Sequence, residues 1–150
     1  MVSWTTRSGA LDSGDTARTM SQENVQIVRA AFEAVNRGDM DGAWVRAAPD
    51  FQLDLSRALG PYRGVYGLSD VRRVADEFWG TWESSRFEVD EFLDAGNHVV
   101  TPFTNLIKGR EAIEVQTRGA WAWTIVDGAV TRLCLYQERV EALEAVGLSE

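Results

Sequence analysis

The sequence predicts an α+β fold built as a single domain, and the main reason is a change of hydrophobic period along the chain. In the first half, apolar residues recur at spacings of three and four, as at Val25, Val28, Phe32 and Val35, which is the period of a helix. After Glu83 the period becomes two, which is typical of strands. Because helical and strand patterns are segregated, we expect an antiparallel sheet packed against the helices.

Residues that begin or end elements divide the chain further. Ser21 and Gly38 suit the N-cap and C-cap of the first helix, and Asp127-Gly128 is a strong hairpin signal. Pro102 marks an edge or a bulge of its strand. The predicted elements are a helix over 21–38, a shorter helix over 39–45, a strand over 51–55, a long loop over 56–67, a helix from Ser69 or Asp70 to 82, strands over 87–93, 98–106, 113–126 and 129–137, and a helix over 140–146.

Composition and charge exclude several classes of function. The 150 residues suffice for one domain, and the formal net charge of −8 disfavours binding to nucleic acids and to anionic membranes. One cysteine, Cys134, and one histidine, His98, exclude an internal disulfide, a cysteine-built metal cage and a multi-histidine metal site. Six tryptophans indicate either large core side chains or an aromatic-lined cavity.

The first 19 residues differ in composition from the rest. They are rich in Ser, Thr, Gly and Asp and poor in apolar residues, so we expect a disordered extension over 1–19 and a folded domain over 20–150. Met20 precedes the helix-start pattern, so the hypothesis is that it is the natural start. The extension has no apolar run of the kind found in secretory signals, and no stretch of about 20 apolar residues occurs, so we expect a cytoplasmic protein.

Four stretches of the chain resemble a known family. They are 28–42, 54–57 with 60–66, 94–100, and 123–130 with 141–148, and they include Asn36-Arg37-Gly38-Asp39-Met40-Asp41-Gly42 and Trp123-Thr124-Ile125-Val126-Asp127-Gly128. The order of elements and these stretches resemble the SnoaL-like group of the nuclear transport factor 2-like superfamily, which also contains ketosteroid isomerases. The resemblance implies a cone-shaped, curved antiparallel sheet wrapped around N-terminal helices, as in cystatin-like folds, and a homodimer.

The catalytic residues known in this superfamily do not match the chain. By the resemblance, the isomerase base falls on Leu55, its tyrosine on Ala31 and its oxyanion aspartate on Trp121, and none of these side chains can do that chemistry. The cyclase acid/base position also falls on Trp121. The epoxide hydrolase positions fall on Asn105, Phe103 and Leu135, which lack the required carboxylates.

These mismatches leave it open whether the chain is an enzyme. Asp54 is the candidate base only if the alignment is shifted by one residue, because such a shift moves a side chain to the other face of a strand. Arg57 or Tyr62, in the loop expected to cover the mouth of the cone, would assist it.

An apolar pocket for a small molecule is the remaining prediction. The predicted ligand-binding residues are Ala31, Leu55, Arg57, Tyr62, Phe103, Asn105, Trp121 and Leu135. The protein is expected to bind or slowly transform a small hydrophobic metabolite of polyketide, terpenoid or steroid type, with no cofactor, because no phosphate loop, dinucleotide motif or metal cluster is present. The alternative is a non-catalytic scaffold or accessory dimerisation domain whose cavity is filled by Trp121.

Overall fold

The N-terminal helix is longer than its apolar pattern predicts. The computed structural model describes residues 13–148, with the side chains of 13–20 and 112 outside the described part. Helix α1 (Ser13–Asn36) includes residues 13–19, which differs from the expected disordered segment. Residues 13–19 include the good helix former Ala17 and no proline. Helix α1, which is stabilised by the packing of its later residues, can therefore begin before residue 20. Residues 1–12 of the predicted extension lie outside the described residues.

The end of α1 and the next helix follow the cap residues seen in the sequence. Gly38 has a φ of 81°, and Asp39 donates its backbone N–H to the carbonyl of Ala34 at 2.8 Å, which ends α1. Asp39 then caps helix α2 (Met40–Ala43) by accepting the N–H of Gly42 at 2.9 Å. Asn36 donates to the carbonyl of Phe87 at 2.9 Å and accepts its N–H at 2.8 Å, which ties the end of α1 to the sheet.

The strands form one curved, unclosed sheet, and the predicted α+β class is confirmed. The strands are β1 (Ala47–Asp54), β2 (Val65–Gly67), β3 (Ser84–Val89), β4 (Leu93–Ala95), β5 (His98–Lys108), β6 (Glu114–Val126) and β7 (Ala129–Tyr136). Their order is β2-β1-β7-β6-β5-β3, and β4 pairs with β5. A short 3₁₀ turn (Arg110–Ala112) joins β5 to β6.

Two prolines lie where the ladder of hydrogen bonds is interrupted. Pro49 falls inside β1, where the register against β7 shifts between Ala47 and Gln52. Pro102 falls between the part of β5 that pairs with β4 and the part that pairs with β3, and its carbonyl accepts the N–H of Asp90. Because proline has no N–H to donate, both positions fit it without loss of a strand bond.

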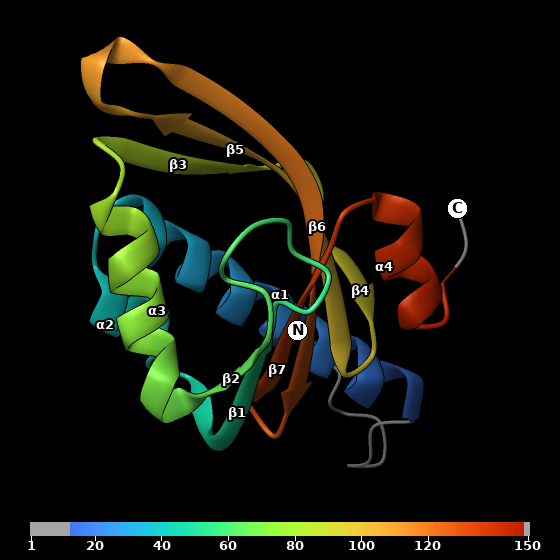
Figure 1. The fold of residues 1–150 in the computed structure, drawn as a ribbon. Coiled ribbons are helices and arrows are strands. Elements are labelled where there is room, and N and C mark those ends of the chain that lie inside the picture. The colour runs from blue at the N-terminus through green and yellow to red at the C-terminus, as the bar shows by residue number, and fades with distance from the viewer. Residues whose placement is uncertain (1–12, 149–150) are drawn as a thin grey trace.

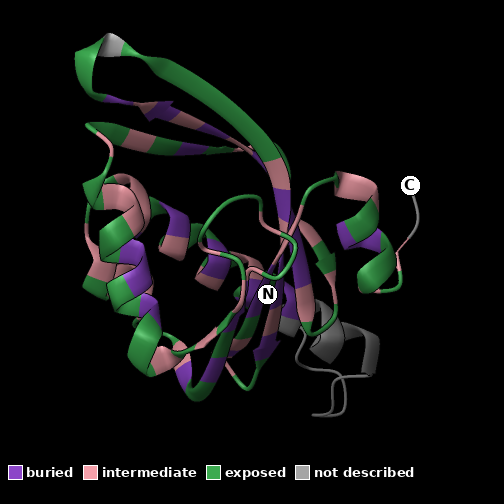
Figure 2. Cartoon of the chain, in the orientation of Figure 1, coloured by how far each residue is buried: buried purple, intermediate pink, exposed green. Residues whose placement is uncertain are grey.

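Helices cover the two faces of the sheet unequally. Trp121 and Trp123 of β6 face the main core, together with α1 and helix α3 (Leu68–Gly80), whereas Ala120 and Ala122 face helix α4 (Arg139–Ala145). Figure 1 shows α3 and α4 on opposite sides of β6. The β6 residues 114–118 are exposed on both faces, at the far end of the long hairpin in Figure 2. No helix in the described part of the chain is long and apolar enough to span a membrane.

Candidate functional site

A cavity of about 380 Å³ lies between the inner face of the sheet and helices α1, α2 and α3. Its lining is mostly apolar. The residues that line it are Ala31, Phe32, Val35, Met40, Ala43, Trp44, Leu53, Leu55, Ala58, Leu59, Tyr62, Val74, Ala75, Phe78, Trp79, Trp82, Phe87, Phe103, Asn105, Ile107, Val115, Thr117, Arg118, Trp121, Trp123, Leu133, Leu135, Tyr136 and Gln137. The strands contribute many of these residues because every second side chain of a strand points to the same face of the sheet.

An aromatic wall forms one side of the cavity. The rings of Phe103 and Trp121, on neighbouring strands β5 and β6, are stacked with centroids 5.8 Å apart and planes inclined by 21°. Phe87 of β3 meets Phe103 edge-on at 5.2 Å. Offset stacks and edge contacts of this kind are favourable aromatic geometries. Trp121 therefore lies in the wall of the cavity, and open volume remains beside it.

The loop after β1 contributes to the mouth of the cavity. Ala58, Leu59 and Tyr62 line the cavity from this loop, and Leu59 is 85% exposed. Tyr62 packs edge-on against Phe78 of α3 at 5.9 Å, and Arg118 of β6, also in the lining, is 80% exposed. A highly exposed leucine beside an apolar cavity indicates that this end is open to solvent.

Asn105 is the buried polar side chain of the described lining. It is 5% exposed and lies on β5 opposite Phe87 of β3 and Thr117 of β6. Its side-chain oxygen accepts a hydrogen bond from the Ser85 hydroxyl at 3.0 Å.

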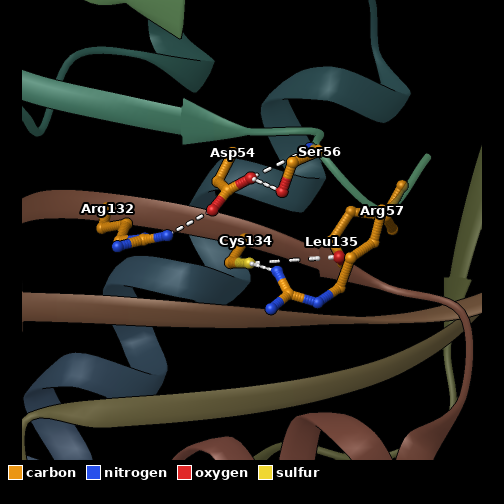
Figure 3. A network of polar contacts seen from close by, with 6 residues as sticks. All are labelled: Asp54, Ser56, Arg57, Arg132, Cys134 and Leu135. Atoms are coloured by element: carbon orange, nitrogen blue, oxygen red, sulfur yellow. Dashed lines mark hydrogen bonds and ion pairs between the residues drawn. The ribbon is translucent and has the colours of Figure 1, made fainter. Parts of the chain in front are cut away.

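Asp54, the predicted base, does not line the cavity. Its neighbours Leu53 and Leu55 do, because alternation along β1 turns Asp54 to the outer face. There it accepts hydrogen bonds from the Ser56 amide at 2.9 Å and the Ser56 hydroxyl at 2.6 Å, and it forms an ion pair with Arg132 of β7 (Figure 3).

The electrostatics of Asp54 also oppose a role as base. Burial by itself would raise the pKa of Asp54, but the hydrogen bonds from Ser56 and the guanidinium of Arg132 outweigh burial and lower the pKa. A carboxylate stabilised in this way is a weak proton acceptor at neutral pH. The geometry gives Asp54 a structural role and does not support the catalytic one.

Arg57 is the predicted ligand-binding residue that falls outside the described lining. Its guanidinium donates to the Cys134 sulfur at 3.6 Å (Figure 3) and lies over the Tyr136 ring at 4.7 Å. Gln137 donates to its carbonyl at 2.7 Å. These contacts fasten the loop to β7. Burial, followed by the contact with Cys134, raises the pKa of Tyr136, so this phenol stays protonated at neutral pH.

The remaining predicted ligand-binding residues all line the cavity. They are Ala31, Leu55, Tyr62, Phe103, Asn105, Trp121 and Leu135. The aromatic side chains that the helices contribute to the lining were not among the predicted site residues. Trp44, Phe78, Trp79 and Trp82 also line the cavity, and the excess of tryptophan was the signal that could have identified them.

Two further features of the described residues concern metal binding and a groove next to the cavity. Among residues 13–148, no three His, Cys, Asp or Glu side chains gather closely enough to hold a metal ion. A groove of about 620 Å³ runs between α1 and α2 and shares Ala31 and Ala43 with the cavity. Ala30 lines the groove but not the cavity.

Comparisons with known proteins agree with this architecture. The family model of the SnoaL-like domain matches residues 28–133, whereas no curated protein matches the chain significantly. TerC, solved with polyporic acid, is 18% identical with a TM-score of 0.69, covering 83% of this chain and 98% of its own. A nuclear transport factor 2-like protein of unknown function from Burkholderia pseudomallei is 21% identical with a TM-score of 0.70, covering 83% of this chain and 98% of its own.

A protein of unknown function with a cystatin-like fold, from Xanthomonas campestris, is 15% identical with a TM-score of 0.66, covering 83% of this chain and 97% of its own. At such identities the likeness to solved structures shows the fold and not the activity. The family match, by contrast, spans more than half of the chain. The chain therefore belongs to the SnoaL-like domain family and has the nuclear transport factor 2-like fold.

Proposed function

We propose that this protein binds a small, flat, hydrophobic metabolite of polyketide, terpenoid or steroid type, without a cofactor. The observation that carries the proposal is the apolar cavity of about 380 Å³ with its stacked wall of Phe103 and Trp121. Cavities of roughly 300–1,000 Å³ are typical of small-molecule sites. The likeness to TerC, which was solved with polyporic acid, supports this class of ligand.

Binding is better supported than transformation. The described lining holds no carboxylate and no imidazole, and its titratable side chains are Tyr62, Tyr136 and the exposed Arg118. General acid–base chemistry on a carbon acid needs a positioned group with a pKa near neutral. Slow transformation remains a prediction, which product analysis of the bound ligand would test.

The alternative of a scaffold with a filled cavity requires Trp121 to occupy the interior. Its stacking on Phe103 beside open volume supports the binding function instead. A homodimer through the outer face of the sheet also stays a proposal, favoured by the exposed residues 114–118 of β6. We expect light scattering to give about twice the chain mass of 16.7 kDa, and a value near 17 kDa at micromolar concentration would contradict the dimer. A cytoplasmic location is a further proposal, testable by cell fractionation.

The test of binding is a thermal-shift and tryptophan-fluorescence screen. Steroids, aromatic polyketides, terpene epoxides and fatty acids are added to the wild type, to Ala31→Leu and to Ala30→Leu. Ala31 lines both the cavity and the groove, whereas Ala30 lines the groove and not the cavity, so only the first variant adds a side chain to the cavity wall. We expect a ligand that raises the melting temperature of the wild type and of Ala30→Leu, and does so less for Ala31→Leu.

Two results would count against the proposal. If no ligand class stabilises the wild type or quenches its fluorescence, the cavity is not a binding site for these metabolites. If ligands bind only to Trp121→Ala, the Trp121 side chain blocks the cavity in solution, and the scaffold function is favoured.

A further inference from the structure

One polar side chain in the apolar cavity has half of its hydrogen-bonding capacity unused. Asn105 is 5% exposed, and its side-chain oxygen is occupied by the Ser85 hydroxyl at 3.0 Å. Its amide NH₂ makes no hydrogen bond to any residue that the structure describes. Because Asn105 lines the cavity, a ligand that fills the space beside it would cover this amide, and a ligand that supplies an acceptor avoids leaving the donor unpaired.

The other unpaired buried polar atoms of the lining have the same character. The indole N–H groups of Trp44 and Trp82 are buried and have no hydrogen-bond partner among the described residues. These groups are donors only, because an indole N–H cannot accept. The buried side-chain atoms of the described lining that have no partner are therefore donors, which favours a ligand that carries acceptor oxygens.

The charge of the lining favours a neutral acceptor over a carboxylate. Arg118 is the cation of the described lining, and it is 80% exposed and lies 4.0 Å from Asp90. A carboxylate placed beside Asn105 would lose its hydration without gaining a buried counterion, which is costly. A ketone oxygen has a smaller desolvation cost and accepts the same hydrogen bond.

The distance between Asn105 and the aromatic wall suits a fused-ring ligand. Asn105 and Phe103 are two positions apart on β5 and face the same side, so their Cα atoms are about 7 Å apart. A planar ligand of two or three fused rings spans this separation. One ring can lie against Trp121 and Phe103 while a carbonyl at its edge meets the amide.

We propose that Asn105 is the specificity-determining residue of the cavity, and that its NH₂ donates to the carbonyl oxygen of a neutral, planar aromatic ketone. Ser85 fixes the amide in this orientation by donating to its oxygen. The proposal rests on the proposed binding function and narrows it to one ligand chemistry.

The test compares two probes of the same shape that differ in the carbonyl. Binding of 9-fluorenone and fluorene is measured by isothermal titration calorimetry for the wild type, Asn105→Leu and Thr104→Val. Thr104 is the adjacent β5 residue on the opposite face and does not line the cavity, so it is the matched control. Fluorene-9-carboxylate is the charged probe.

We expect the wild type and Thr104→Val to bind fluorenone about fivefold more tightly than fluorene, the ratio that one net hydrogen bond gives. Asn105→Leu should bind both probes with equal affinity. The carboxylate should bind the wild type more weakly than either neutral probe. If the leucine variant does not fold, Asn105→Val replaces it, because an apolar side chain cannot donate a hydrogen bond and should lose the preference.

The outcomes separate this inference from the function on which it rests. If the wild type binds both neutral probes equally, or if the apolar variant at Asn105 keeps the fivefold preference, Asn105 does not select the ligand, although the cavity still binds. Tightest binding of the carboxylate would also overturn the inference. If neither neutral probe binds the wild type, the proposed binding function fails for flat hydrophobic ligands.

Discussion

The Asp54–Arg132 pair gives a quantitative prediction that separates a structural from a catalytic role. Asp54→Asn keeps the size of the side chain and one acceptor oxygen, so a bond from Ser56 is retained. It loses the attraction to Arg132, which is worth about 1 kcal/mol because the Arg132 side chain is 48% exposed. The substitution also places an amide NH₂ next to the Arg132 guanidinium. Because both groups are donors, the hydrogen bond between them is lost, which costs about 1 kcal/mol more.

We therefore expect Asp54→Asn to lower the free energy of unfolding by about 2 kcal/mol at pH 7. The measurement is urea denaturation of both proteins, followed by tryptophan fluorescence. Arg132→Gln and the double variant complete a thermodynamic cycle, and we expect a coupling energy of about 1 kcal/mol. Ligand binding in the cavity should not change, because Asp54 faces the opposite side of the sheet.

The pH dependence of this difference has a defined sign. The pKa of Asp54 is lower in the folded protein than its ordinary value of 3.8, so the ionised carboxylate stabilises the fold above about pH 4. That contribution is lost as the pH falls through the folded-state pKa. The gap between wild type and Asp54→Asn should therefore be largest near neutral pH and shrink below about pH 4. A variant as stable as the wild type at pH 7, or a gap that does not change with pH, would refute the reasoning.

Three further substitutions test other parts of the structure, each by urea denaturation against the wild type. Gly119→Ala should cost about 1–2 kcal/mol, because an added Cβ would lie 3.1 Å from the Phe103 ring, and an unchanged midpoint would contradict that packing. Asn36→Ala should cost about 2 kcal/mol through its two lost bonds to the Phe87 backbone, whereas a cost near zero would show that α1 is not held there. Trp121→Ala should cost about 3 kcal/mol, at the low end of the loss for a fully buried tryptophan, since the residue is partly exposed; a clearly larger loss would mean that the ring fills the interior.

Local patterns predicted the elements of the sheet better than their pairing. Asp127 and Gly128 have φ values of 50° and 79°, as the two central residues of the predicted hairpin turn require, and β6 and β7 pair across them. The parallel pairing of β1 with β7 was not predicted, because nothing in the sequence of either strand identifies a distant partner. Strand β4 was missed as a separate element because three residues are too few to show a period.

The site was predictable where strand alternation determines which face a residue occupies. Trp121, Phe103 and Leu135 line the cavity as predicted because their strands are long and regular. Trp44 and Trp82 were not predicted to line the cavity, since a helical stripe looks the same whether it packs on other side chains or borders an open cavity. Whether volume remains beside them depends on how side chains from five or more elements meet, which no local pattern records.

The parallel pair of β1 and β7 also bears on the order in which the chain can fold during synthesis. Asp54 pairs in register with Cys134, 80 positions later, so one side of β1 has no partner until the last strand has left the ribosome. The hairpin of β5 and β6, by contrast, joins neighbours along the chain and can form as it emerges. Leu53 and Leu55, which border the cavity, are thus positioned late. A nascent chain stopped after β6 would carry the tryptophan-bearing strand and helices α1 to α3, yet it would lack β7, which joins β1 to β6. Its apolar interior would be exposed at that stage, which makes it a target for chaperones.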